Sequence, residues 1–251
     1  MHRRRVLKAL AGLALCPVCA NFGFAAEEAH WNYEGAQGPA HWGDLEPADQ
    51  TCSVGCRQSP ISIDSTIEAR LAPLEFAWAR QANTIVNNGH TIQLNFDDGG
   101  TLTVGSNRYT LVQFHFHHPG EHRIDNKGFR MEAHFVHRNA AGSLGVIGVW
   151  MVAGKSNPVF AKVVATMPPA EGPPVKADPG IDPNGLLPAK FGYYLYSGSL
   201  TTPPCSETVD WMLLTNPIEV AETDIAAFAT LYPMNARPVQ KLDRRFVLRS
   251  S

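Results

Sequence analysis

Short runs, in which hydrophobic and polar residues alternate or all residues are apolar, recur along most of the chain. They cover residues 61–63, 84–87, 91–96, 101–104, 111–117, 130–137, 145–152, 193–197 and 208–215. Turn-forming sequences separate several of these runs, including DDGG at 97–100, DNKG at 125–128 and NAAG at 139–142. A period of two, interrupted by frequent turns, is typical of β-strands joined by tight connections. The pattern therefore predicts a mostly antiparallel sheet.

Helical periodicity is scarce. The best helix candidates are residues 159–166 and 222–231, and both are short. A Pro- and Gly-rich stretch at 168–188 resembles a linker, but the chain that follows it is too short to suggest a second core. We therefore predict a mainly β chain with short helices (α+β), folded as a single domain with residues 168–188 as a long surface loop.

The composition is that of a globular protein. Of the 251 residues, 44% are hydrophobic and 18% are charged, which supplies one sizeable core. The net charge is -2, and no basic run lies beyond the first eight residues. Nucleic-acid-binding domains carry a basic patch, so nucleic acid is not an expected partner.

The N-terminus has the pattern of an export signal. A basic sequence, RRRVLK, occupies positions 3–8, an apolar stretch covers 9–20, and small residues occur within 23–25. The apolar stretch is too short to span a bilayer. We therefore expect residues 1–25 to be removed on export to the periplasm or the cell exterior.

Two export routes fit the basic start, since RRRVLK suits both the twin-arginine and the general secretory pathway. A lipid anchor is not expected, because Leu15 precedes Cys16 where a small residue would be required. No stable membrane anchor is therefore expected, and residues 26–251 form the mature domain.

Five cysteines are present: Cys16, Cys19, Cys52, Cys56 and Cys205. The first two lie within the predicted export signal, and we assign them no catalytic role. In an oxidising compartment two of the remaining three are expected to pair. Cys205 is one partner unless Cys52 and Cys56 bridge each other, and the residues alone leave these alternatives open.

Histidines cluster in the sequence QFHFHHPGEH at 113–122, which holds four of the ten in the chain. Side chains alternate between the two faces of a strand. One face is expected to carry Leu111, Gln113, His115 and His117, and the other Val112, Phe114 and Phe116. Such a cluster is either a surface feature without consequence or a site held together for chemistry.

A second strand resolves the choice. In RMEAHFVH at 130–137, Glu132, His134 and Val136 share one face. If the two strands pair antiparallel, His134 comes beside His115 and His117. Three neutral imidazoles on rigid strands form an open tetrahedral zinc site, although copper also fits nitrogen ligands.

Each of two histidines has an acceptor two residues before it on the same face, Gln113 before His115 and Glu132 before His134. A metal-bound imidazole usually donates its other N–H to such a group, which supports the metal site. The remaining histidines of this region are interpreted as surface or packing residues: His118, His122 and His137.

These motifs resemble the α-class carbonic anhydrases. FHFH, GEH and EAHFVH are followed by YSGSLTTPPCSETVDWMLL, and five further motifs occur in the same order: NYEGAQGPAHWGDL, CRQSPISI, NNGHTIQLNF, GVIGVW and MNARPVQKL. The resemblance covers almost the whole mature chain. It implies one catalytic domain around a large central, mostly antiparallel β-sheet. It also implies a carbon–oxygen lyase that reversibly hydrates carbon dioxide to bicarbonate and a proton.

The resemblance also implies roles for single residues. The Zn²⁺ ligands would be His115, His117 and His134, oriented by Gln113, Glu132 and the backbone carbonyl of Asn235. The apolar wall where carbon dioxide rests would be Val136, Val146, Leu200, Val209 and Trp211, with Thr202 on the substrate side.

In the implied mechanism, zinc-bound hydroxide attacks carbon dioxide. Thr201 would accept a hydrogen bond from this hydroxide and donate one to Glu121, which orients the attacking lone pair. His90 would shuttle the released proton to buffer, since imidazole titrates near neutral pH. An esterase side activity follows from the same chemistry.

The cysteines resemble those of exported bacterial members, in which a thiol upstream of QSP pairs with one after TTPP. This implies a Cys52–Cys205 disulfide and a free Cys56, with Cys56–Cys205 as the alternative. The bridge would pin the threonine loop.

Two other functions fit the sequence less well. A non-catalytic binding module on this fold would be expected to lack a zinc histidine, and a metal buffer to carry dense Met, His and Cys tracts. We therefore expect a small-molecule enzyme, either a monomer or a homodimer.

Overall fold

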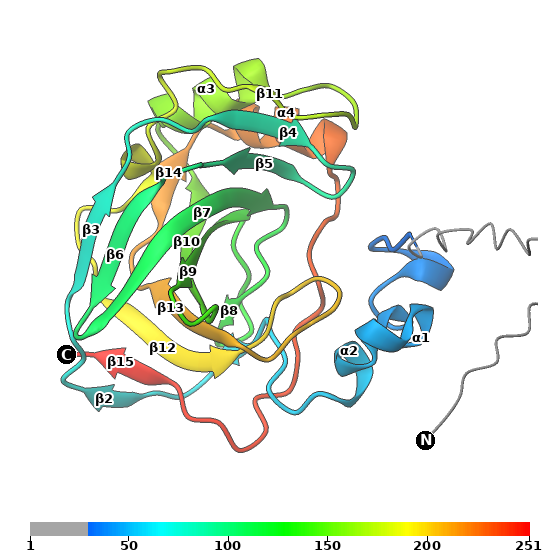
Figure 1. The fold of residues 1–251 in the computed structure, drawn as a ribbon, viewed down its shortest axis with the longest axis vertical. Coiled ribbons are helices and arrows are strands. Elements are labelled where there is room, and N and C mark those ends of the chain that lie inside the picture. The colour runs from blue at the N-terminus through cyan, green and yellow to red at the C-terminus, as the bar shows by residue number, and fades with distance from the viewer. Residues whose placement is uncertain (1–29) are drawn as a thin grey trace, which may run out of the picture. The chain divides into compact units, whose positions relative to one another are not determined.

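Strands account for most of the regular structure in residues 30–251, the part of the chain that the computed structural model describes (Figure 1). Residues 1–29, with the predicted export signal and its two cysteines, lie outside the described residues. Residues Trp31–Ser251 form one compact unit. The strands are β1 (Ser62–Ile63), β2 (Ile67–Ala69), β3 (Leu74–Trp78), β4 (Thr84–Asn87), β5 (Ile92–Asn95), β6 (Gly100–Val104), β7 (Asn107–His117), β8 (Arg123–Ile124), β9 (Met131–Asn139), β10 (Leu144–Ala153), β11 (Val175–Lys176), β12 (Tyr193–Gly198), β13 (Val209–Leu214), β14 (Ile218–Val220) and β15 (Leu248–Ser250).

Helices are few and short in this part of the chain. The α-helices are α1 (Trp42–Leu45), α2 (Thr51–Val54), α3 (Pro158–Thr166) and α4 (Glu222–Leu231), and the 3-10 helices are η1 (Gly35–Gln37), η2 (Pro47–Asp49) and η3 (Pro183–Leu186). The side chain of Asn157 caps α3 by accepting hydrogen bonds from the N–H groups of Val159 and Phe160. Within residues 30–251, no helix has the length and apolar character that crossing a bilayer requires.

One large sheet of 13 strands forms the centre of the fold, in the order β11-β4-β5-β7-β9-β10-β13-β12-β15-β2, with β3, β6 and β14 joined to it. Most neighbouring strands run antiparallel, as the alternating pattern predicts. The exceptions in this sheet are the parallel pairs β10–β13, β10–β14 and β15–β2. β1 and β8 pair parallel in a separate two-stranded sheet.

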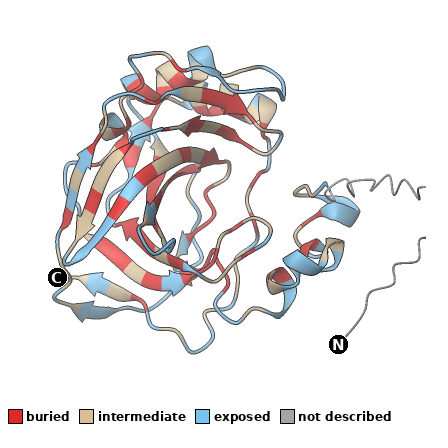
Figure 2. Cartoon of the chain, in the orientation of Figure 1, coloured by how far each residue is buried: buried red, intermediate tan, exposed pale blue. Residues whose placement is uncertain are grey.

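A large apolar core lies on one face of the central strands. It contains Phe114, Phe116 and Phe135 from β7 and β9, together with Phe160 of α3 and Phe228 of α4, all fully buried. α3 and α4 lie close to the end of the sheet that carries β4 and β5 (Figure 1). Buried stretches follow the central strands, as Figure 2 shows. This packing holds β7 and β9 against the core and leaves His115, His117 and His134 on the opposite face.

A β-bulge in β7 corrects one prediction. The register of β7 against β9 shifts between Leu111 and Gln113, so Val112 is the extra residue. Leu111 consequently lies in the same core as Phe114 and Phe116 rather than on the histidine face. Downstream of the bulge the alternation is as predicted.

The stretch 168–188 is more structured than the predicted surface loop. It contains β11, which pairs with β4, and the 3-10 helix η3. Three of its apolar side chains reach the core and are fully or almost fully buried: Ala177, Ile181 and Leu186. It belongs to the single domain, as expected, but part of it completes the core.

Candidate active site

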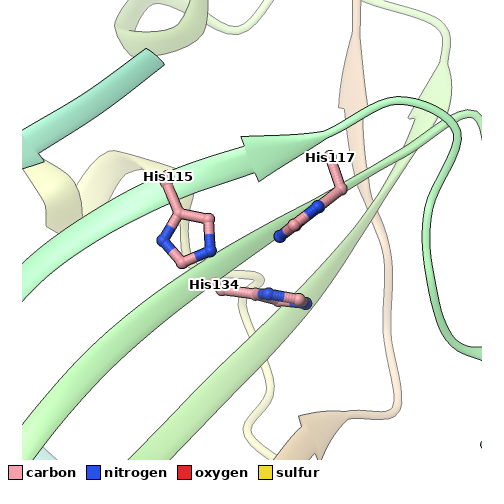
Figure 3. A group of neighbouring side chains, drawn as sticks. All are labelled: His115, His117 and His134. Atoms are coloured by element: carbon pink, nitrogen blue, oxygen red, sulfur yellow. The ribbon is translucent and has the colours of Figure 1, made fainter. Parts of the chain in front are cut away.

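Three imidazoles meet on the face of β7 and β9 opposite the large core (Figure 3). The two strands pair antiparallel, and His115 lies directly opposite His134 in the register. His117, at the end of β7, completes the group, and one nitrogen from each ring lies within 4.8 Å of the others. The ring centroids are 4.5 to 5.3 Å apart. The rings therefore face a common space.

Each ring is held by an oxygen acceptor on its outer nitrogen. The distances are 2.8 Å from His115 Nδ1 to Gln113 Oε1, 2.7 Å from His117 Nδ1 to the Asn235 carbonyl, and 2.9 Å from His134 Nε2 to Glu132 Oε1. A carbonyl or carboxylate oxygen can only accept, so the hydrogen of each ring lies on the outer nitrogen. The inner nitrogens then present lone pairs to the common space.

Electrostatics favour neutral rings. Burial lowers the pKa of all three imidazoles, and that of His117 to about 4. Burial alone would raise the pKa of Glu132, but the imidazoles of His122 and His134, both hydrogen-bonded to it, hold it well below its usual range. An ionised carboxylate therefore supports His134 from behind.

The donor set fits a zinc ion. Nε2 of His117 is buried and has no hydrogen-bond partner among residues 30–251. A metal ion would satisfy its lone pair by coordination. Three neutral imidazole nitrogens, each fixed by an outer acceptor, are the ligands that catalytic zinc takes, with one position left open. A second group of potential ligands, His122, Glu132 and His134, is joined by internal hydrogen bonds.

Glu121 lies beside the imidazoles in the loop after β7. It is almost completely buried, and its Oε1 accepts a hydrogen bond from the backbone N–H of Arg237 at 2.8 Å. Burial raises the pKa of Glu121 to about 7, although interactions with His134, Arg237 and the Thr201 side chain lower it. Oε2 has no hydrogen bond of ordinary length to any described residue. Thr201 is buried, and its side chain interacts with this carboxyl group.

The predicted wall residues lie together. Val146 of β10 is paired with Val136 of β9 on one side and with Trp211 of β13 on the other. Val209 belongs to the same buried cluster, and Leu200 packs against it. The indole of Trp211 also contacts His134, with ring centroids 4.8 Å apart. An apolar surface therefore adjoins the imidazoles, and Thr202, which is half-buried, follows Thr201 in the loop.

His90 is farther along the chain, in the turn between β4 and β5. The side chain of Asn88 accepts hydrogen bonds from the backbone N–H groups of His90 and Thr91, and Gly89 adopts a φ of 84°. The half-buried imidazole of His90 stacks on Trp31, with ring centroids 3.6 Å apart and an interplanar angle of 8°. Trp31 is a partner that the sequence patterns did not single out.

His122, interpreted from the sequence as a surface or packing residue, is a hydrogen-bond partner of Glu132. It is fully buried, and its Nδ1 lies 2.8 Å from Glu132 Oε1 and its Nε2 2.6 Å from the Tyr196 hydroxyl. Alternation cannot identify it, because it lies in a loop. By contrast, His137 is a buried packing residue, as interpreted.

The cysteines follow the pairing that the resemblance implies. Cys52 and Cys205 form a disulfide across a sequence separation of 153, and Cys56 is free and exposed. Cys205 lies in the threonine loop, where its N–H donates to the carbonyl of Thr202 at 2.9 Å. The bridge therefore attaches this loop to α2.

Comparisons with known proteins identify the family of the chain. The sequence model of the eukaryotic-type carbonic anhydrases matches residues 37–251. Carbonic anhydrase of Pectobacterium carotovorum is 40% identical over 225 residues, which is 89% of this chain and 92% of that protein. Carbonic anhydrase of Nostoc sp. is 38% identical over 258 residues, which is 99% of this chain and 97% of that protein.

A solved structure gives the same result. The α-carbonic anhydrase of Thermovibrio ammonificans, in complex with the inhibitor sulfanilamide, superimposes with a TM-score of 0.85 and 44% sequence identity. The match covers 88% of this chain and 99% of that chain. On these matches of sequence and fold, the chain belongs to the eukaryotic-type (α-class) carbonic anhydrases, the lyases that hydrate carbon dioxide.

Proposed function

We propose that this enzyme uses Zn²⁺ for the reversible hydration of carbon dioxide to bicarbonate and a proton. The observation that carries the proposal is the convergence of His115, His117 and His134, each with its outer nitrogen fixed by an acceptor. When bound there, zinc supplies a Lewis acid that lowers the pKa of a coordinated water to about 7, a value established for carbonic anhydrases themselves.

Glu121 and Thr201 would orient the water that reacts. A carboxylate accepts hydrogen bonds but does not donate them, so an ionised Glu121 requires the Thr201 hydroxyl to donate toward it. The threonine oxygen would then remain able to accept a hydrogen bond from that water. The N–H of Arg237 holds the carboxyl group in place at 2.8 Å, which supports this role.

Carbon dioxide would rest against the cluster of Val136, Val146, Leu200, Val209 and Trp211, with Thr202 at its edge. The substrate carries no charge and gains little from polar partners. Its transfer from water to an apolar surface is favourable for the same reason that apolar side chains are buried. The contact between Trp211 and His134 supports a resting place close to the reacting centre.

His90 would pass the released proton to buffer in solution. An imidazole exchanges protons near neutral pH, and this one lies half-buried in a turn rather than in the core. Its stack on Trp31 supports a defined position for the ring.

The protein would act outside the cytoplasm. We assign residues 1–25 to the export signal and 26–251 to the catalytic domain. The Cys52–Cys205 disulfide supports this assignment, because such bridges persist in oxidising compartments. Carbon dioxide and bicarbonate would be its small-molecule partners. The protein would be a monomer or a homodimer.

Metal analysis combined with stopped-flow carbon dioxide hydration tests the proposal on residues 26–251. We expect about one zinc per chain. His134→Ala should lose both the metal and the activity. His118→Ala is the matched control, because its ring contacts the Pro233 carbonyl instead of the common space. An active enzyme without metal would refute the proposal.

A further inference from the structure

Arg237 is a buried cation in the C-terminal segment, 2% exposed. Its Nη2 donates to the carbonyl of Cys52 at 3.0 Å, and its Nη1 donates to Gln58 Oε1 and to the carbonyl of Ser59, both at 2.8 Å. The guanidinium lies 5.6 Å from the centre of the Trp42 ring. All three acceptors are neutral, so the side chain is buried at a cost that no hydrogen-bonded carboxylate offsets.

Gln58 extends this contact to the other half of the disulfide. Its Nε2 donates to the carbonyl of Cys205 at 3.2 Å and to Glu207 Oε1 at 2.9 Å. The carbonyls of both bridged cysteines are therefore bound by two side chains, Arg237 and Gln58, which also bind each other. The hydrogen-bonded group and the disulfide form one unit.

The same unit reaches the proposed catalytic pair from both sides. The backbone N–H of Arg237 donates to Glu121 Oε1 at 2.8 Å. On the other side, the N–H of Cys205 donates to the carbonyl of Thr202, next to Thr201. One route from the disulfide thus ends at Glu121 and the other at the threonine loop.

We propose that Arg237 is a positioning residue through which the Cys52–Cys205 disulfide sets the alignment of Glu121 against Thr201. The planar guanidinium binds its acceptors in a fixed geometry, so it fixes the backbone of residue 237 relative to α2. The disulfide fixes α2 relative to the threonine loop. This inference rests on the proposed roles of Glu121 and Thr201.

A merely structural role for Arg237 makes a different prediction. If the arginine only fills its site, its loss and the loss of the disulfide act independently, and their effects on activity multiply. If the disulfide acts through Arg237, removal of one abolishes the effect of the other. A double-mutant cycle therefore separates the two roles.

The experiment compares four zinc-loaded proteins of residues 26–251: the parent, Arg237→Gln, Cys52→Ala/Cys205→Ala, and the combined variant. Zinc content and stopped-flow carbon dioxide hydration are measured for each, with the pH profile of kcat/KM. We expect either change to lower kcat/KM on the order of tenfold at full zinc content, because a small misplacement caused by a residue away from the chemistry slows the reaction. The variant that combines the changes should have a kcat/KM no lower than that of the slower of the two variants, Arg237→Gln and Cys52→Ala/Cys205→Ala.

Arg245→Gln is the matched control. Arg245 also binds backbone carbonyls of neighbouring segments, those of Gln58 and Ser197, but no hydrogen bond joins it to Glu121. Its effect should multiply with that of the cysteine changes, and the midpoint of its pH profile should stay at the parent value. The midpoint of Arg237→Gln should shift. Arg237→Lys, which keeps the charge, takes the place of Arg237→Gln if the latter does not fold.

The inference would be overturned if the effects of Arg237→Gln and of the cysteine changes on kcat/KM multiply. It would also be overturned if the pH profile of Arg237→Gln is the same as that of the parent. Either result would leave the proposed function intact. A parent protein without zinc or without hydration activity would instead refute the proposed function.

Discussion

The backbone carbonyl of Asn235 lies 2.7 Å from Nδ1 of His117, although the two residues are 118 positions apart in the chain. The side chain of Asn235 fixes this carbonyl. Its Oδ1 accepts from the N–H of His118 at 2.6 Å, and its Nδ2 donates to the carbonyls of His90 and Phe116 at 3.0 and 2.9 Å. One asparagine therefore connects the end of β7 with the turn that carries His90.

Asn235→Ala should weaken zinc binding by about 10- to 100-fold, the usual cost of losing a partner behind a metal ligand. The main-chain carbonyl is retained, but it loses the side-chain bonds that hold it in place, so His117 is less well oriented. Competition with a chelator measures the affinity. Asn216→Ala is the control, because that exposed amide donates only to Lys190 and Thr215 among the described residues. Equal zinc affinity in the two variants would contradict the prediction.

Removal of the disulfide by Cys52→Ala/Cys205→Ala should lower the free energy of unfolding by about 5 kcal/mol. The reason is that a bridge across a sequence separation of 153 removes much of the entropy of the unfolded chain. Urea denaturation at saturating zinc measures the change. Cys56→Ser, at the exposed free thiol, should leave stability near the parent value. A double variant as stable as Cys56→Ser would rule out this contribution.

The alternating pattern predicted β9 better than β7, for a physical reason. Met131, Ala133 and Phe135 lie in the large core as expected, because the register of β9 against β10 is regular. In β7 the bulge after Leu111 depends on the register of the partner strand. The alternation of residues within one strand does not contain that information, and so Leu111 was assigned to the wrong face.

The site shows the same limit. Residues on regular strands, such as His115 and His134, could be predicted from alternation and one strand pairing. His122 could not, because its loop is buried only where it folds onto Glu132. The carboxylate of Glu132 accepts a hydrogen bond from the backbone N–H of His122 at 2.8 Å. Arg237 could not either, because it binds Gln58 across 179 residues. Long-range contacts, invisible in a local pattern, decide the environment of both.

His137 should make the protein less stable in mild acid. Burial lowers the pKa of His137 to about 4, although hydrogen bonds to the carbonyls of Gly145 and Phe135 partly oppose the shift. Above pH 6.5 the ring is neutral in both states and adds no pH dependence. Between pH 6.5 and 4 only the unfolded chain takes up the proton, so the free energy of unfolding falls as the pH falls. Below pH 4 both states are protonated.

The full effect of this residue is about 3 kcal/mol, from a shift between 6.5 and about 4. His137→Gln keeps a donor for the Gly145 carbonyl but does not titrate. We therefore expect the gap in unfolding free energy between the parent and this variant to change by about that amount between roughly pH 7 and pH 4. Urea denaturation at several pH values measures it. Parallel curves for the two proteins would show that His137 does not contribute.

His90→Ala should slow carbon dioxide hydration in weak buffer, because the proton then has no imidazole to carry it from the site. A positioned proton-transfer group contributes roughly 100-fold or more, so a loss of at least tenfold at low buffer concentration is expected. Added imidazole should restore the rate by doing the same transfer from solution. Stopped-flow measurements across a series of buffer concentrations test this, with His118→Ala as the control. A rate in His90→Ala that matches the parent at every buffer concentration would remove His90 from the proton path.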